Sequence, residues 1–150
     1  MKIDVGFGKI ETDDINIVSV DGKYGSSNNV FADGCVAIYK KNGTKTSYFV
    51  GRGFSVGKLQ DAVRMMGSLF KDSGVQGFVV IRDRFLININ NMNSIYLEPT
   101  GDGLFLVEAI FKNGQVVEIY RGQRGKFAAN LVKDYQRAER DYFNSIEQVK

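Results

Sequence analysis

The sequence predicts an α+β protein, with a mainly antiparallel sheet built from two β-hairpin–helix units and with a long C-terminal helix. Short apolar runs are separated by 17 glycines and only one proline, which is typical of a β-rich chain. Two Asn-Gly pairs lie between β-forming runs, and two other stretches change to helical spacing. The length of 150 residues fits a single domain, which we expect to span 1–150.

Alternation of apolar and polar residues predicts the strands, and turn residues such as Asp21-Gly22 and those at 99–103 separate them. The polar stretch at 22–34 is expected to be a loop. Asn42-Gly43 and Asn113-Gly114 predict type I′ hairpins, because both central residues of that turn need positive φ. The expected strands cover residues 3–10, 15–20, 35–40, 46–50, 77–81, 84–89, 94–97, 104–111 and 115–120.

Spacings of three and four between apolar residues predict two helices. The first follows Ser55, a suitable N-cap, and ends near the Asp72-Ser73-Gly74 stop signal. The second runs from about Lys126 to the end of the chain. Its heptad-like apolar stripe consists of Phe127, Leu131, Tyr135, Ala138, Tyr142, Ile146 and Val149.

The two faces of this last helix have different expected surroundings. The apolar stripe is covered either by the chain's own core or in part by a second copy in a homodimer or higher homo-oligomer. Its two tyrosines favour an interface, because their hydroxyls need partners. The opposite face is expected to be solvated and carries Lys133, Asp134, Arg137, Glu139 and Arg140.

The two predicted hairpins match at a fixed offset. Residues 35–43 align with 106–114, 71 positions apart, and both segments end in Lys-Asn-Gly. Gly51 then matches Gly122, and each hairpin leads through a Gly/Arg turn into a helix. The match indicates either an internal duplication with a pseudo-twofold axis or two unrelated hairpins that use the same turn.

The side-chain inventory excludes several kinds of chemistry. The chain has no histidine and a single cysteine, which excludes an intrachain disulfide, zinc held by His or paired Cys, and every catalytic pair that contains histidine. Cys35 opens an apolar strand, so we expect it to be buried and unreactive. We predict no cofactor and no metal site. Residues 1–4 lack the apolar core of a signal peptide, and we expect a cytoplasmic protein without a membrane partner.

The best candidate for a binding segment is the turn before the last helix. The formal charge of +3 permits an anionic partner without requiring one. In this turn, cations and glycines lie between two aromatic residues, a pattern that suits phosphate contact combined with stacking. A solvated loop has the same composition. The candidate ligand-binding residues here are Tyr120, Arg121, Arg124, Lys126 and Phe127.

The turn before the first helix, at 51–58, is a second candidate. Its glycines and the helix N-terminus favour an anion, and Arg52 and Lys58 add positive charge. The segment matches neither the P-loop nor the Gly-x-Gly-x-x-Gly pattern, so a plain strand-to-helix connection is the alternative. Arg82-Asp83-Arg84 is a third basic element, with a local ion pair as its alternative.

These features predict a non-enzymatic binding protein for an anionic ligand, which is a nucleotide or a nucleic-acid segment. The size and the Gly/Asn-rich composition suit a small phage or bacterial accessory protein that sequesters a signal nucleotide or blocks a host factor. One alternative is a protein–protein interaction or inhibitor module that uses the sheet face and the C-terminal helix.

A further alternative is a magnesium-dependent nuclease, with Asp21 and Asp83 following apolar strands. Val20-Asp21-Gly22, followed by a hairpin and a helix, resembles the opening of ribonuclease H-type nucleases. That resemblance implies strand-end aspartates that hold magnesium. Gln60 and Asp61 stand where that family places a glutamate, and the later strand order departs from it.

Overall fold

The structure, a computed structural model, describes residues 1–21, 34–50 and 54–148, with side chains as far as residue 146. Most of the expected loop at 22–34 and the candidate Arg52 lie outside the described residues. The chain divides into two compact units, residues 1–88 and 89–150. The predicted class is confirmed, because the protein is α+β with antiparallel sheets and a long C-terminal helix. A single domain over the whole chain stays a prediction.

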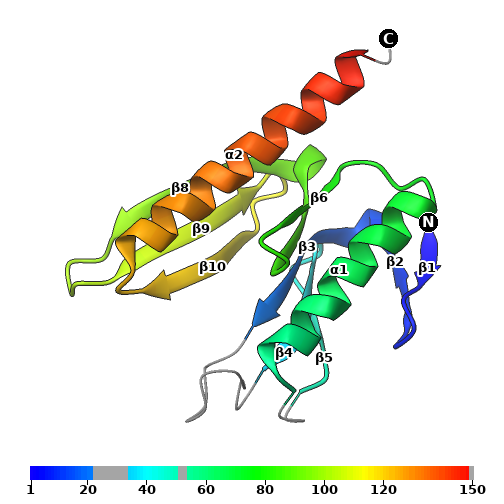
Figure 1. The fold of residues 1–150 in the computed structure, drawn as a ribbon, viewed down its shortest axis with the longest axis horizontal. Helices are drawn as coiled ribbons and strands as arrows, with labels where there is room; N and C mark the ends of the chain where they lie inside the picture. Colours follow the sequence, from blue (N-terminus) through cyan, green and yellow to red (C-terminus); the bar gives the residue numbers. More distant parts are fainter. Residues whose placement is uncertain (22–33, 51–53, 149–150) are drawn as a thin grey trace. The chain divides into compact units, whose positions relative to one another are not determined.

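The first unit combines a helix with an antiparallel sheet in the order β5-β4-β3-β7-β6, while β1 and β2 form a separate two-stranded sheet (Figure 1). Strand β7 lies beside β3, with Ile87 opposite Ile17. The elements are β1 (Lys2–Asp4), β2 (Lys9–Glu11), a 3-10 turn η1 (Thr12–Asp14), β3 (Ile15–Asp21), β4 (Cys35–Lys40), β5 (Lys45–Tyr48), α1 (Val56–Asp72), β6 (Phe78–Ile81) and β7 (Phe85–Asn88).

Helix α1 covers the sheet of the first unit, and its limits confirm the sequence prediction. The Ser55 hydroxyl caps the helix by accepting the backbone N–H of Lys58 at 3.3 Å. The helix ends before Gly74, which has a φ of +82°. The spacing of four, three and four residues puts the apolar side chains on the face toward the sheet. The buried residues of α1 are Leu59, Val63, Met66 and Phe70.

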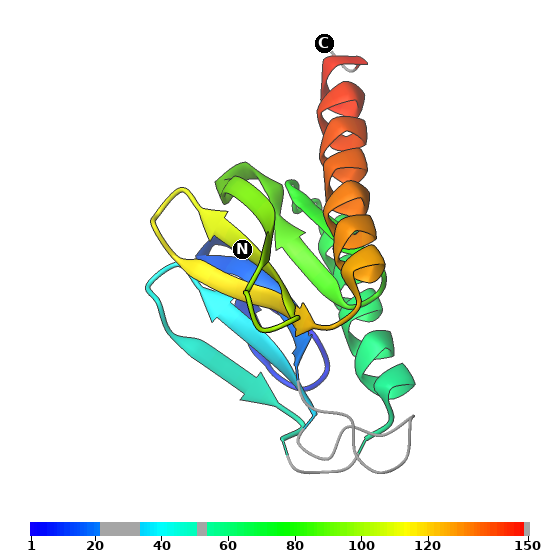
Figure 2. The same cartoon turned by 90° about the vertical axis from the view of Figure 1, so that its left-hand side faces the viewer.

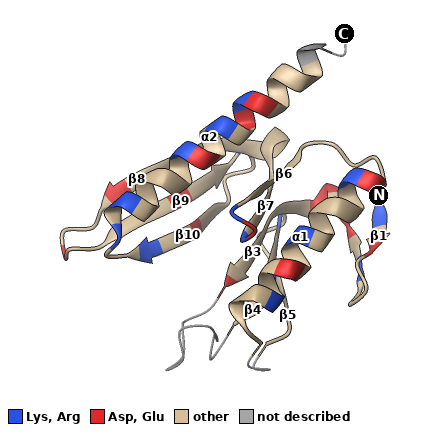
Figure 3. Cartoon of the chain, viewed as in Figure 1, with Lys and Arg blue, Asp and Glu red and all other residues tan. Residues whose placement is uncertain are grey.

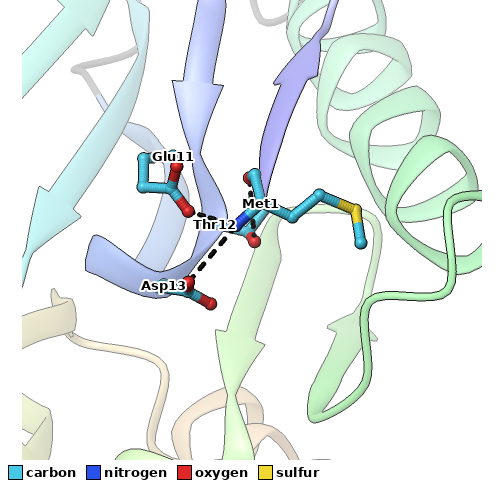
Figure 4. A network of polar contacts seen from close by, with 4 residues as sticks. All are labelled: Met1, Glu11, Thr12 and Asp13. Carbon is cyan, nitrogen blue, oxygen red and sulfur yellow. Dashed lines mark hydrogen bonds and ion pairs between the residues drawn. The ribbon is translucent and has the colours of Figure 1, made fainter.

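The expected strand at 3–10 is wrong, because a tight turn divides it into β1 and β2. The Asp4 carboxylate accepts the N–H of Gly6, whose φ is +90°, and the N–H of Val5 donates to the carbonyl of Gly8. Figure 4 shows how the chain start is held: the Met1 ammonium contacts the carboxylates of Glu11 and Asp13, and Thr12 donates to the Met1 carbonyl.

The second unit places α2 against a three-stranded antiparallel sheet in the order β10-β9-β8. Ala128, Leu131 and Tyr135 of α2 are buried. Figure 1 and Figure 2 show the last turns of α2 reaching past the ends of these strands. No helix among the described residues is long and apolar enough to cross a membrane. The elements are a 3-10 turn η2 (Ile89–Asn91), β8 (Met92–Pro99), β9 (Phe105–Phe111), β10 (Val116–Gly122) and α2 (Gly125–Gln148).

The two units repeat the same local sequence of elements, namely a 3-10 turn, three antiparallel strands and a helix. The strand pairing shifts in register at the start of the first of these three strands in both units, between Ile15 and Ile17 in β3 and between Met92 and Ser94 in β8. The matching hydrogen bonds, Lys41 N–H to Asp14 and Lys112 N–H to Asn91, both measure 2.7 Å. The units differ in that β7 covers the outer edge of β3. The pseudo-twofold relation itself is not confirmed.

The type of the Asn-Gly turns was predicted wrongly. Gly43 and Gly114 have φ values of 87° and 91°, but Asn42 and Asn113 are not in the positive-φ region. Gly43 N–H donates to the Lys40 carbonyl, and Gly114 repeats this bond. These are three-residue loops with a left-handed glycine, which is the other common hairpin solution.

Candidate anion-binding surface

The turn from the end of β10 into the start of α2, residues 121–125, has a defined backbone because aromatic rings lie against it. The Tyr120 hydroxyl accepts the backbone N–H of Arg124 at 3.1 Å. A Cβ at Gly122 would lie 2.5 Å from that hydroxyl, and one at Gly125 would lie 2.9 Å from the Phe105 ring. At both positions a residue with a Cβ would collide with an aromatic side chain, so glycine is required. The cations of this turn therefore project from a backbone that these rings hold in place.

The two aromatic residues of the candidate site contact each other. The rings of Tyr120 and Phe127 have centroids 5.0 Å apart and are tilted by 55°. The Arg124 guanidinium lies 5.1 Å from the centroid of the Phe127 ring, within the range of a cation–π contact. Stacking on this ring holds the exposed guanidinium near the start of α2.

The three cations of this turn differ in how their charge is compensated. Arg121 forms an ion pair with Glu118, with Nε and Oε1 2.8 Å apart, and about half of each side chain is exposed. Such a pair contributes little to stability, but it reduces the positive charge that Arg121 offers to a ligand. No ion pair joins Arg124 or Lys126 to a carboxylate in the part of the chain that the structure describes.

Arg124 and Lys126 lie at the positive end of the α2 dipole. The first turn of α2 contains no acidic residue, although acidic side chains are the ones that stabilise this position. Two exposed cations at the positive end of this helix dipole produce a local excess of positive potential. A bound anion would relieve this repulsion.

The remaining residues predicted for the site lie elsewhere or outside the description. Lys58 is exposed in the first turn of α1, in the other unit. Arg52 falls outside the described residues. Arg82 and Asp83 form the tight turn between β6 and β7, where Asp83 lies 3.7 Å from Arg64. The assignment of these residues to one binding site stays a prediction.

A row of basic side chains on α2 was not assigned to a site from the sequence. The row comprises Lys133, Arg137 and Arg140, which together with Gln136 line an open hollow of about 360 Å³. Their spacing of three, one and three residues places them on one face of the helix. This spacing was a readable signal, but a charged helix face is also what a solvated surface looks like.

The acidic residues considered for metal-dependent chemistry have other partners. The Asp21 carboxylate accepts hydrogen bonds from the hydroxyls of Ser19, at 2.6 Å, and Tyr39. Within the described ranges, no three Cys, Asp or Glu side chains group closely enough to hold a metal ion. Cys35 is 8% exposed, which confirms its expected burial, and desolvation raises the pKa of its thiol.

Comparisons with known proteins assign no family to this chain. No protein family model matches it, and no curated protein matches it. Among solved structures, it is similar to the LytTr DNA-binding domain of a Bacillus cereus protein described as a methyl-accepting/DNA response regulator. The identity is 15%, the TM-score is 0.38, and the match covers 90% of this chain and 94% of that one. At this distance the function has to be argued from the chain's own residues.

Proposed function

We propose that the protein is a non-enzymatic binding protein that holds an anionic ligand, a nucleotide or a nucleic-acid segment, at the start of α2. The observation that carries this proposal is the pair of exposed cations, Arg124 and Lys126, at the positive end of a helix whose first turn has no acid. Arg124 is positioned by the Phe127 ring. Guanidinium groups held in this way suit phosphate oxygens.

The rigid turn supports recognition of a ligand over a merely solvated loop. An anchored backbone and a stacked guanidinium lose little conformational entropy when they bind. Figure 3 shows the basic positions at the end of β10 and at the start of α2 near one another. A small phage or bacterial accessory protein that sequesters a signal nucleotide or blocks a host factor would act through a surface of this kind.

Equilibrium titrations test the proposal. A labelled 12-nucleotide DNA strand, ATP and a cyclic dinucleotide are titrated with the protein at 50 and 200 mM salt. The Arg124→Gln/Lys126→Gln variant should bind at least about five-fold more weakly than wild type, and binding should weaken with salt. Lys9→Gln/Lys112→Gln removes the same charge from exposed sites away from the turn and is the matched control. Equal losses in both variants, or no binding of any probe, would refute a site at this turn.

A second candidate function, a protein–protein interaction module, is favoured by the end of α2. Phe143 is 44% exposed, and its ring packs on Tyr142 with centroids 5.4 Å apart. We propose a second copy of the chain as the partner of this end of the helix, which would give a homodimer. Light scattering on wild type and Phe143→Ser checks this directly: a dimer that becomes monomeric supports it, and a wild-type monomer at 100 µM rejects it.

A further inference from the structure

The outer face of α2 continues the positive surface away from the turn. Cations and amides, all exposed except the half-buried Asn130, recur along one side of the helix, opposite the buried Ala128, Leu131 and Tyr135. At 100° per residue, these positions stay for four turns within a stripe that covers about a third of the helix circumference. The stripe, here called the α2 basic face, consists of Lys126, Asn130, Lys133, Gln136, Arg137 and Arg140.

The charges of the α2 basic face are available to a ligand. Among the residues that the structure describes, no carboxylate forms an ion pair with Lys133, Arg137 or Arg140. Glu139 is engaged on the other side of the helix, where it accepts the Tyr135 hydroxyl at 2.8 Å. Like charges three and four residues apart destabilise an isolated helix. Arg137 stands in this relation to Lys133 and Arg140, while Asp134 and Asp141, three and four residues from Arg137, offset part of the repulsion.

An open, shallow hollow lies at the centre of this face. It measures about 360 Å³ and lies between the exposed side chains of Lys133, Gln136, Arg137 and Arg140, which are three cations and one amide. This is the chemistry that holds phosphate groups: positive charge with several N–H donors, and room for oxygen atoms between them.

We propose that the α2 basic face binds consecutive phosphates of a nucleic-acid strand, so that the ligand is a polymer and not a mononucleotide. From Lys126 to Arg140 the row is about 21 Å long at the rise of an α-helix. Along the axis of B-DNA, successive phosphates of one strand advance by about 3.4 Å, so a row laid along that axis spans about six of them. This inference rests on the proposed function and extends its site from the turn along the helix.

A length series with matched variants tests the inference. Wild type is titrated with ATP and with DNA strands of 3, 6, 12 and 18 nucleotides. The face variant is Lys133→Gln/Arg137→Gln/Arg140→Gln, which keeps good helix formers on α2. The charge-matched control is Lys9→Gln/Lys71→Gln/Lys112→Gln, at exposed sites off this face. Circular dichroism verifies that each variant keeps its helix content.

We expect wild-type affinity to rise steeply up to about six nucleotides and the face variant to lose at least about ten-fold for the 12-mer. The slope of log K against log salt should fall by about two to three for the face variant and stay unchanged for the control. Affinity for ATP should be the same in wild type and the face variant.

The outcomes separate this inference from the proposed function. A face variant that binds the 12-mer like wild type, while Arg124→Gln/Lys126→Gln weakens it, overturns the α2 face and leaves the turn as the site. A control variant that loses as much affinity for the 12-mer as the face variant also overturns the inference, because net charge alone then explains binding. If wild type binds no nucleotide and no strand, the proposed function fails as well.

Discussion

The Tyr120 hydroxyl accepts the backbone N–H of Arg124 at 3.1 Å, and this bond closes the turn that precedes α2. The Tyr120 ring also packs on Phe127, so one side chain determines both the backbone of the turn and the position of its aromatic partner. The geometry of the basic turn therefore depends on a residue that is not charged.

Tyr120→Phe should keep the ring contact and remove only this acceptor. We expect the free energy of unfolding to fall by about 1 kcal/mol, which is typical of one lost hydrogen bond. Urea denaturation measures the change. Tyr142→Phe is the control, since its hydroxyl has no partner among the described residues; an equal loss in both variants would mean that the bond to Arg124 is not the cause.

Asp83→Gly should stabilise the first unit. Arg82 and Asp83 have φ values of 53° and 54°, the backbone of a type I′ turn, which glycine adopts most readily and which asparagine and aspartate tolerate better than other side chains. Relief of the remaining strain at Asp83 should raise the free energy of unfolding by up to about 1 kcal/mol, although the exposed contact with Arg64 is lost. Arg64→Gln isolates the loss of that contact. Thermal melts of both variants test the prediction. A melting temperature of Asp83→Gly below that of wild type would contradict it.

Gly43→Ala and Gly114→Ala should each destabilise the protein by about 1–2 kcal/mol. Both glycines have positive φ, and nothing lies within 4 Å of an added Cβ, so strain of the backbone is the only cost. Gly43→Asn and Gly114→Asn should lose less stability than the alanine variants, because asparagine tolerates positive φ better than alanine does. Chemical denaturation of the four variants checks this order; alanine and asparagine variants of equal stability would exclude backbone strain as the cause.

Two glycines of α1 should respond to alanine in opposite directions. A Cβ at Gly57 has only the Ser55 hydroxyl near it, at 4.0 Å, so alanine should stabilise the helix by up to about 1 kcal/mol. A Cβ at Gly67 would lie 2.7 Å from a methyl group of Val80, so alanine should destabilise there. Adding Val80→Ala to Gly67→Ala should recover stability relative to Gly67→Ala. Unfolding in urea measures all three, and no recovery would rule out this clash.

The Cys35 thiol should react slowly while the protein is folded. Desolvation by burial raises its pKa, so little thiolate is present near neutral pH. The pKa of this thiol is higher in the folded than in the unfolded protein. Its protonated form therefore contributes its full share to the free energy of unfolding below the unfolded pKa, and this contribution is lost as pH rises through the folded pKa. Alkylation by iodoacetamide at pH 8 should be much slower than in urea. Between pH 8 and 10.5, wild type should lose more stability than Cys35→Ala; equal slopes would contradict the raised pKa.

Local signals predicted much of the secondary structure. The N-cap of α1 was readable because Ser55 acts on a backbone N–H three residues away. The Asn-Gly pairs located both hairpins, because glycine is the residue that takes positive φ at little cost. They did not determine the turn type, since the same pair fits a two-residue and a three-residue loop.

The candidate site was predictable in composition and not in arrangement. Charge and spacing located the basic turn at residues 120–127. The compensation of Arg121 by Glu118 became visible only in the structure, because a side chain's partner depends on how neighbouring strands and turns fold back. The α2 basic face was visible as a spacing, but its concavity was not.

The sequence alone predicted the α+β class, the two hairpins and the two helices, because each depends on residues close together along the chain. It also excluded histidine chemistry, because a missing side chain cannot be supplied by folding. The position of β7 beside β3, with Ile87 opposite Ile17, became known from the fold. Alternation marks which face of a strand is buried, whereas the partner along its edge depends on backbone groups that are the same in every residue.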